Sequence, residues 1–223
     1  MKKIGVITIG QSPRNDVMED LRPILGNEIE LLEKGALDNW QIADLKKLTF
    51  CTDDYILVSK MRDGSNVHFA ERHIRPFLQG CICDLEAQQV KAIMFLCTGK
   101  FPAFQSQVPI LYPNKILQAV VPALIGKGAI IVLTPSQQQL TQSKAKWSSF
   151  FTDVTPLAVS PYNNTYEDLN KAIPLLNKLP AKYILMDCIG YSNKMKLYLE
   201  AKTGKTIILA RTMVARIARE LLD

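Results

Sequence analysis

Two cysteines stand at matched places in the sequence and could exchange protons with a substrate. Cys97 and Cys188 each follow a run of four or five apolar residues, directly or after one residue, and each precedes a glycine by two positions, Gly99 or Gly190. The pattern predicts that both sulfurs lie where a buried strand gives way to a loop, where backbone amides favour the thiolate. A thiolate can remove a proton and a thiol can return one. The competing interpretation is that each cysteine packs as a small apolar side chain.

Polar residues near the other predicted strand ends could bind an anion. Ser12 is a typical helix N-cap and Pro13 a typical first helical residue, and the cap alone would explain both. Arg14 adds a guanidinium to this helix N-terminus, and the combination suits a carboxylate or phosphate. The predicted substrate-binding residues are Gln11, Ser12, Arg14, Thr98, Gly99, Thr134, Ser136 and Gly190.

The sequence contains no recognised metal, nucleotide or cofactor motif. Cys81 and Cys83 are separated by one residue and lack the spacing of a zinc knuckle. His68 and His73 are five apart on a predicted helix, which does not place them on one face. The Walker A and dinucleotide glycine patterns are absent. We therefore expect no cofactor and no metal. We interpret Cys51, Cys81 and Cys83 as core or surface residues.

The composition is that of a globular protein with an excess of positive charge. The chain has 223 residues, 48% hydrophobic residues and a formal net charge of +6. Its lysines and arginines are dispersed, without a basic block interleaved with aromatic residues, so no nucleic-acid partner is expected. The charge instead suits solubility or the attraction of a small anionic ligand, such as the carboxylate or phosphate considered above.

Hydrophobicity and cysteine content bear on where the protein works. No segment reaches the ~18 apolar residues of a transmembrane helix, and we expect no membrane partner. The first apolar run, 4–9, is interrupted by Gly5 and reads as a strand rather than a signal sequence. Five cysteines are an odd number and are expected to be free thiols in a reducing compartment, so a cytoplasmic location is predicted. The sequence is compatible with a homodimer.

Short apolar runs alternate with amphipathic segments along the chain. The clearest predicted strands are 4–9, 55–58, 92–96, 129–133, 183–186 and 206–209, with weaker ones at 28–33 and 154–159. The predicted helices are 14–25, 67–89, 114–125, 136–150, 166–179, 192–202 and 212–222. This alternation predicts an α/β fold of mostly parallel sheets flanked by helices.

The pattern of strand ends is repeated in the two halves of the chain. The repeat predicts two pseudo-symmetric lobes, residues 1–105 and 106–210, with a C-terminal helix, 211–223, packing back on the first lobe. Ligands of parallel sheets bind beyond the carboxyl ends of the strands. We therefore expect Cys97 and Cys188 to face one cleft between the lobes.

Four stretches resemble the AroM family, and the likeness runs over nearly the whole chain. They are Thr8-Ile9-Gly10-Gln11-Ser12-Pro13-Arg14, Leu78-Gln79-Gly80, Met186-Asp187-Cys188-Ile189-Gly190-Tyr191 and Ala215-Arg216-Ile217-Ala218-Arg219-Glu220-Leu221-Leu222. The resemblance implies the two-lobed fold of the aspartate/glutamate racemase superfamily, whose typical enzymes use no cofactor. It also implies that Cys97 and Cys188 match the two thiols that exchange a proton with the carbon α to a carboxylate.

The flanks of both cysteines differ from the superfamily racemases. Those enzymes commonly have Cys-Asn-Thr at the first thiol, where this sequence has Cys97-Thr98-Gly99. At the second they commonly have Gly-Cys-Thr followed by an acidic residue or histidine, where this sequence has Asp187-Cys188-Ile189-Gly190. These differences disfavour amino-acid racemisation and leave isomerisation, decarboxylation and hydantoin-type racemisation open. Asp187 is interpreted as a residue that orders the site.

The alternative function is a binding or regulatory protein linked to aromatic amino-acid metabolism, which keeps the racemase-like cleft without its chemistry. In that case both thiols would react like ordinary cysteines.

Overall fold

The computed structural model describes residues 2–162 and 165–221 and forms two compact units. The first unit comprises Met1–Asn114 and Ala215–Asp223, and the second comprises Lys115–Val214. The helices that follow the fourth strand of each sheet, α4 (Pro113–Ile125) and α8 (Ala210–Glu220), are the elements at which the chain passes from one unit to the other. Residues 222–223, at the end of the predicted C-terminal helix, lie outside the described part of the chain.

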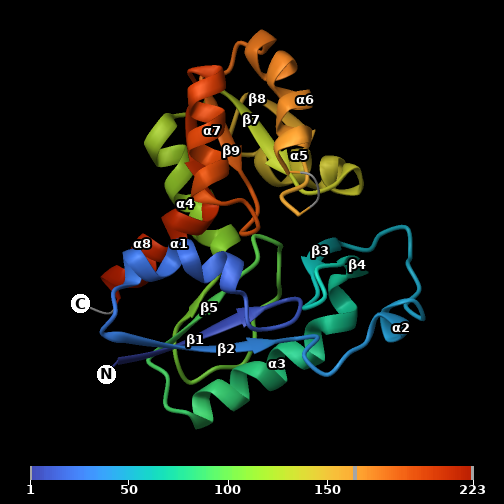
Figure 1. The fold of residues 1–223 in the computed structure, drawn as a ribbon, viewed down its shortest axis with the longest axis vertical. Helices are drawn as coiled ribbons and strands as arrows, with labels where there is room; N and C mark the ends of the chain where they lie inside the picture. Colours follow the sequence, from blue (N-terminus) through green and yellow to red (C-terminus); the bar gives the residue numbers. More distant parts are fainter. Residues whose placement is uncertain (1, 163–164, 222–223) are drawn as a thin grey trace. The chain divides into compact units, whose positions relative to one another are not determined.

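The first unit is built around a parallel sheet of four strands. Its elements are β1 (Lys2–Thr8), α1 (Asn15–Leu25), β2 (Ile29–Gly35), α2 (Ile42–Leu45), β3 (Ile56–Lys60), β4 (Asn66–Ala70), α3 (Glu71–Ala87), β5 (Ala92–Phe95) and β6 (Ile110–Leu111). The strand order is β2-β1-β5-β6, with every pair parallel. Figure 1 shows α1 on one face of this sheet and α3 on the other. The central strands are buried on both faces, as their near-continuous apolar runs predict.

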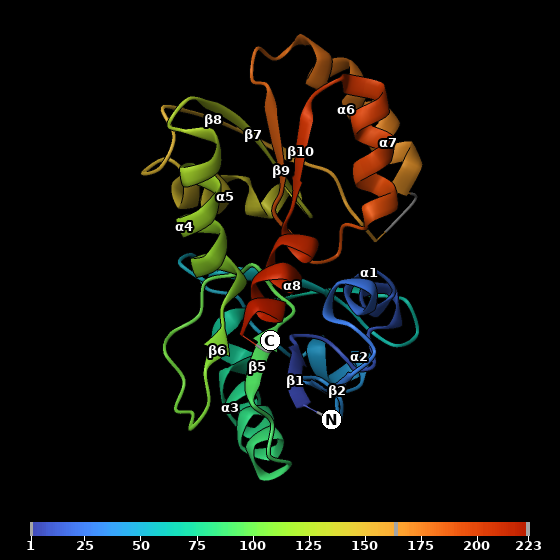
Figure 2. The ribbon, with the colours of Figure 1, turned by 90° about the vertical axis from the view of Figure 1, so that its left-hand side faces the viewer.

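The second unit repeats this plan. Its elements are β7 (Ala129–Thr134), η1 (Gln137–Gln139), α5 (Leu140–Trp147), β8 (Asp153–Ala158), α6 (Thr165–Lys178), β9 (Tyr183–Met186), α7 (Asn193–Thr203) and β10 (Thr206–Leu209), together with α4 and α8. The order β8-β7-β9-β10 is also fully parallel and matches the order of the first sheet strand for strand. Figure 2 shows α4 and α5 on one face of this sheet and α6 and α7 on the other. The predicted α/β fold of two pseudo-symmetric halves is confirmed.

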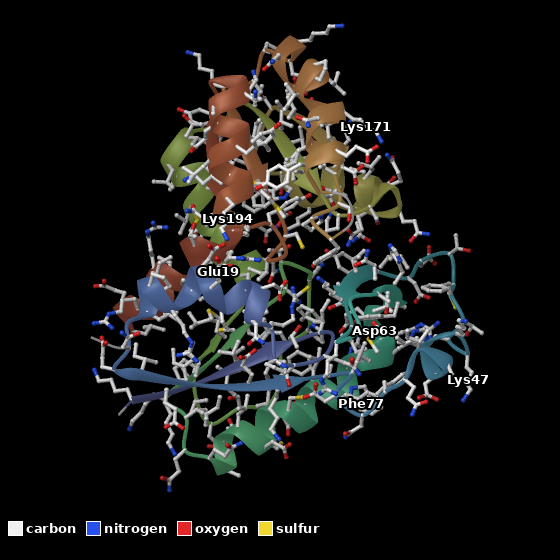
Figure 3. The ribbon with its side chains drawn as sticks, viewed as in Figure 1. Glu19, Lys47, Asp63, Phe77, Lys171 and Lys194 are labelled. Atoms are coloured by element: carbon white, nitrogen blue, oxygen red, sulfur yellow. The ribbon has the colours of Figure 1, made fainter. Side chains whose placement is uncertain are left out.

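One predicted helix begins too early, and one predicted strand belongs to a different sheet. The helix predicted over 67–89 begins only at Glu71, because 66–70 forms β4 and pairs antiparallel with β3. The alternation that marks this strand is short: Val67 and Phe69 are buried, whereas His68 between them is exposed. The segment predicted as a parallel strand at 55–58 is therefore one arm of a hairpin, whose turn carries Asp63 (Figure 3).

Some surface lysines pair with acidic residues close to them in the sequence. Lys47, after α2, pairs with Asp44, and Lys171, on α6, pairs with Glu167. Figure 3 shows Lys47 and Lys171 extending from different elements of the chain. Within the described residues, no helix is both long enough and apolar enough to cross a bilayer.

Candidate active site

Cys97 and Cys188 occupy equivalent positions in the two sheets. Each lies two residues beyond the last residue of the third strand, in chain order, of its four-stranded sheet, β5 or β9. The intervening residue still donates its backbone N–H to the central strand, 2.7 Å to the carbonyl of Ile7 on β1 and 3.0 Å to that of Leu133 on β7. In both units the cysteine thus directly follows a residue that is hydrogen-bonded to the central strand.

The same tight turn follows both cysteines. The backbone N–H of Gly99 donates to Sγ of Cys97 at 3.3 Å, and the N–H of Gly190 donates to Sγ of Cys188 at 3.3 Å. An amide donated to sulfur stabilises negative charge there. The Cys-x-Gly spacing seen in the sequence is therefore a repeated geometry that suits a thiolate.

Glycine is required in both turns because other side chains press against the backbone. A Cβ at Gly99 would lie 2.6 Å from Cδ2 of Leu57, on β3. A Cβ at Gly190 would lie 2.6 Å from the ring and hydroxyl of Tyr162. A side chain at residue 190 would press on Tyr162, which contacts Cys188, and a Cβ at residue 99 would also lie 3.2 Å from Sγ of Cys97.

Tyr162 is the polar neighbour of the second thiol. Its hydroxyl lies 3.5 Å from Sγ of Cys188, and Cys188 is itself buried. Tyr162 is not among the predicted site residues; it lies 26 positions from the cysteine in a loop after β8. Only the close packing against Gly190 brings it there, and no local pattern signals that contact.

We expect the Tyr162→Phe variant to alkylate Cys188 about fivefold more slowly at pH 7, because a hydroxyl that donates to a thiolate contributes about 1 kcal/mol. Iodoacetamide labelling followed by peptide mass spectrometry measures the rate. Tyr166→Phe, a half-exposed tyrosine on α6, is the matched control and should leave the rate unchanged. Equal rates in the two variants would contradict a polar role for Tyr162.

Asp187, directly before Cys188, is held in a buried ion pair. Its carboxylate accepts two hydrogen bonds from Nζ of Lys146, at 2.8 and 2.9 Å, and one from the indole N–H of Trp147 at 2.8 Å. The Lys146 and Asp187 side chains are only 11% and 5% exposed. The last turn of α5 thereby anchors the end of β9 and neutralises the carboxylate beside the thiol.

A fully buried arginine holds the turn after Cys188. Arg211, in the first turn of α8, donates from Nε to the carbonyl of Ile189 at 2.8 Å and from Nη2 to that of Gly190 at 3.1 Å. Arg211 is not among the predicted site residues. An arginine two positions after a buried apolar strand is the signal that could have indicated it, because buried arginines are rare and need partners.

The predicted substrate-binding segment 11–14 is tied to its own unit. The amide of Gln11 donates to the carbonyls of Leu37 and Trp40 at 3.0 and 2.9 Å. The backbone N–H and hydroxyl of Ser12 both donate to the carboxylate of Asp38, at 2.7 and 2.8 Å. The Asp38 carboxylate occupies both Ser12 donors in this structure, so the binding role of the segment stays a prediction.

Ser12 is not the helix cap that the sequence predicts. Helix α1 begins at Asn15, and the residue in the cap position is Arg14, two places later. Its guanidinium makes a bidentate pair with Asp16, both distances being 2.8 Å, and its backbone N–H donates to Glu33 at 2.7 Å. Arg14 is buried in this arrangement, and its predicted role toward an anion is untested.

Asp38 is expected to be important for stability. Asp38→Ala removes the acceptor of Ser12, of the Gly35 amide at 2.7 Å and of Arg62 at 2.8 Å. We expect a loss of about 2 kcal/mol in the free energy of unfolding, since donors are left unsatisfied in a partly buried place. Urea unfolding measures it. Asp84→Ala, which removes an exposed pair with Lys34, should cost less than about 0.5 kcal/mol, and equal losses would refute the difference.

The remaining predicted binding residues lie beyond the strand ends. Thr98 is buried in the turn after Cys97, and the Thr134 hydroxyl, at the end of β7, lies 3.3 Å from Oε1 of Gln139. Ser136 lines an open groove of about 500 Å³ in the second unit, bounded by β8 and α6. Within the described residues its buried Oγ has no hydrogen-bond partner, which makes this hydroxyl the clearest donor for a ligand.

The other cysteines and the histidines form no second site. Burial raises the pKa of Cys81 to about 11, whereas Cys51 and Cys83 are exposed. Over the part of the chain that the structure describes, no three His, Cys, Asp or Glu residues gather as metal ligands. His68 is on β4 rather than on a helix with His73, contrary to the sequence prediction.

Comparison with known proteins places the chain in a family and in a fold. A family model described as AroM protein matches residues 4–222. No curated protein matches significantly. Among solved structures, allantoin racemase from Klebsiella pneumoniae has a TM-score of 0.64 at 13% identity, covering 100% of this chain and 88% of that chain.

Two further structures are similar. The maleate isomerase Iso from Pseudomonas putida S16 has a TM-score of 0.62 at 13% identity, covering 100% of this chain and 94% of that chain. Glutamate racemase isoform RacE1 from Bacillus anthracis has a TM-score of 0.65 at 15% identity, covering 99% and 81%. At these identities the likeness shows a shared fold.

Proposed function

The chain belongs to the AroM family, and we propose that it is a cofactor-independent enzyme in which Cys97 and Cys188 act as acid and base on one small carboxylate. The observation that carries the proposal is the repeated cysteine turn. Both sulfurs follow the third strand of their sheets, and both accept a glycine amide two residues on. A cysteine that served only the core would have no reason to repeat this geometry in each unit.

The proposed reaction moves one proton at each sulfur. One cysteine, as thiolate, takes the proton from the carbon α to the carboxylate and becomes a thiol, while the bonding electron pair delocalises toward the carboxylate. The other cysteine, as thiol, returns a proton to that carbon and becomes a thiolate. Charge and protons balance without an oxidant or a reductant.

The proposed substrate is a small carboxylate or related carbon acid rather than an ordinary amino acid. Ile189 stands where superfamily racemases commonly have threonine, so a hydroxyl that grips an amino-acid carboxylate is missing beside Cys188. Ser136, whose buried hydroxyl lacks a partner among the described residues, is a candidate to bind the carboxylate instead. Small carboxylates and hydantoins that carry a hydrogen on the carbon next to the carbonyl are therefore the first compounds to test; allantoin, which is named in one of the similar structures, is such a hydantoin.

Deuterium incorporation in D₂O tests this function without knowledge of the product. Each candidate compound is incubated with the protein, and NMR and mass spectrometry follow deuterium at its α-carbon. We expect at least one acid to gain deuterium, and the Cys97→Ser/Cys188→Ser double variant to be inactive with it.

A result in which some acid binds but none exchanges or turns over would contradict the proposed function. It would favour the alternative, a binding or regulatory protein of the same fold.

A further inference from the structure

The peptide group after Cys188 connects a buried charge to the sulfur. The carbonyl of Ile189 and the N–H of Gly190 belong to one peptide unit. Arg211 donates to that carbonyl at 2.8 Å, and the N–H donates to Sγ of Cys188 at 3.3 Å. The three groups form a continuous chain, from guanidinium through carbonyl and amide to sulfur.

We propose that Arg211 acts through this peptide to hold Cys188 as the thiolate, which makes Cys188 the base of the resting site. A cation bound to a carbonyl polarises the peptide and strengthens the hydrogen bond that its N–H donates. Arg211 is 1% exposed, so its field is weakly screened there. Its second hydrogen bond, from Nη2 to the carbonyl of Gly190 at 3.1 Å, fixes the turn in this orientation.

The other ionisable groups near Cys188 are arranged so that they do not cancel this effect. Asp187 carries the negative charge nearest in sequence, and Lys146 pairs with it at 2.8 Å. Tyr162 presents a hydroxyl to the sulfur at 3.5 Å. Burial raises the pKa of Tyr191 well above its usual value, and its hydroxyl donates to the carbonyl of Val159. Tyr191 is therefore neutral, and Arg211 supplies positive charge through the turn itself.

The role of Cys188 as the base in catalysis rests on the proposed function, but its state as a thiolate does not. The state of the sulfur can be measured with no substrate present. If the ionisation of Cys188 depends on Arg211 but no acid is turned over, this inference holds and the proposed function fails. If the enzyme is active but the ionisation of Cys188 does not depend on Arg211, only this inference fails.

Alkylation kinetics test it in a Cys51→Ser/Cys83→Ser background, which removes the two exposed thiols. Iodoacetamide labelling of Cys188 is followed by peptide mass spectrometry from pH 5 to pH 10. Arg211→Gln, which keeps amide donors but loses the charge, should label about tenfold more slowly at pH 7, and its pH profile should move to higher pH. Arg211→Lys, which keeps the charge, should remain nearer to the unsubstituted protein.

Controls separate this effect from simple loosening of the fold. Arg216→Gln, an exposed arginine on the same helix, should change neither rate nor profile. Loosening would expose Cys188, which is 9% exposed, and would speed its labelling rather than shift the profile upward. A Cys188 profile that is the same in Arg211→Gln and in the unsubstituted protein would overturn the inference.

A measurement on the unsubstituted protein decides the matter if Arg211→Gln does not fold. In a ¹⁵N-labelled sample, the Gly190 amide and the Arg211 Nε–H resonances are followed through a pH titration. Both should shift with the same midpoint as Cys188 ionises. An Arg211 Nε–H signal that stays still while the Gly190 amide moves would overturn the inference.

Discussion

Replacing either Cys97 or Cys188 by serine is expected to lower the rate of net conversion by about 10²- to 10⁴-fold, the contribution of a positioned acid or base. The reason is that a serine hydroxyl fits the turn and still accepts the glycine amide, yet it does not ionise near neutral pH. The rate of product formation with the acid identified by deuterium incorporation measures the effect.

The two single variants should differ in what they retain. Without Cys97 the remaining thiolate can still remove and return a proton on one face of the substrate, so exchange without net conversion can persist. Without Cys188, the proposed base, exchange from the starting substrate should be lost too. Cys83→Ser, at an exposed thiol on α3, is the control and should be fully active. Full activity in either the Cys97→Ser or the Cys188→Ser variant would contradict the two-thiol mechanism.

Removing the ammonium of Lys146 is expected to cost about 3–5 kcal/mol of unfolding free energy, the second large effect. Lys146→Met would leave the Asp187 carboxylate, which is only 5% exposed, without its cation, although the Trp147 indole would still donate to it. Urea or thermal unfolding measures the loss. Lys171→Met removes an exposed ion pair with Glu167 and should cost less than about 0.5 kcal/mol.

A double variant identifies the cause of that loss. Lys146→Met/Asp187→Asn removes the buried charge while the asparagine oxygen can still accept from the indole of Trp147. It should therefore be more stable than Lys146→Met alone, as expected when two groups are coupled. A double variant that loses the sum of the two single losses would show that Lys146 acts through packing and not through the carboxylate.

Most of the fold could be predicted from local patterns. Apolar runs such as Ala92–Phe95 and Ala129–Thr134 are long enough to indicate strands buried on both faces, and their repeated order indicates two similar halves. The β3–β4 hairpin was misassigned because its second arm has only five residues and leads directly into α3. In so short a segment, one exposed histidine between two buried residues is only a weak indication of a strand. The strong helical pattern that follows it outweighs that indication.

The site could be predicted only where its chemistry lies in one stretch of sequence. The turns at Cys97 and Cys188 are local, and the spacing to glycine marks both. Contacts made by Tyr162 and Arg211 with the Cys188 turn arise from packing between distant elements, 26 and 22 positions apart, which no local pattern encodes.

The Ser12 prediction failed for the same reason. The hydroxyl that resembles a helix cap is taken by a carboxylate 26 positions away, at Asp38, and the helix begins three residues later. A side chain that could cap a helix can instead bond to a better-placed partner far along the chain. The sequence does not show which residue that partner is.

Chemical cross-linking of Cys97 to Cys188 tests the central claim most directly. A short bis-alkylating reagent such as dibromobimane is applied in the Cys51→Ser/Cys83→Ser background, where the raised pKa of about 11 keeps Cys81 unreactive at pH 7. If the two thiols act on one substrate, a single reagent should join the peptides that carry Cys97 and Cys188 within one chain. Separate modification of both cysteines, with no linked peptide, would contradict the account.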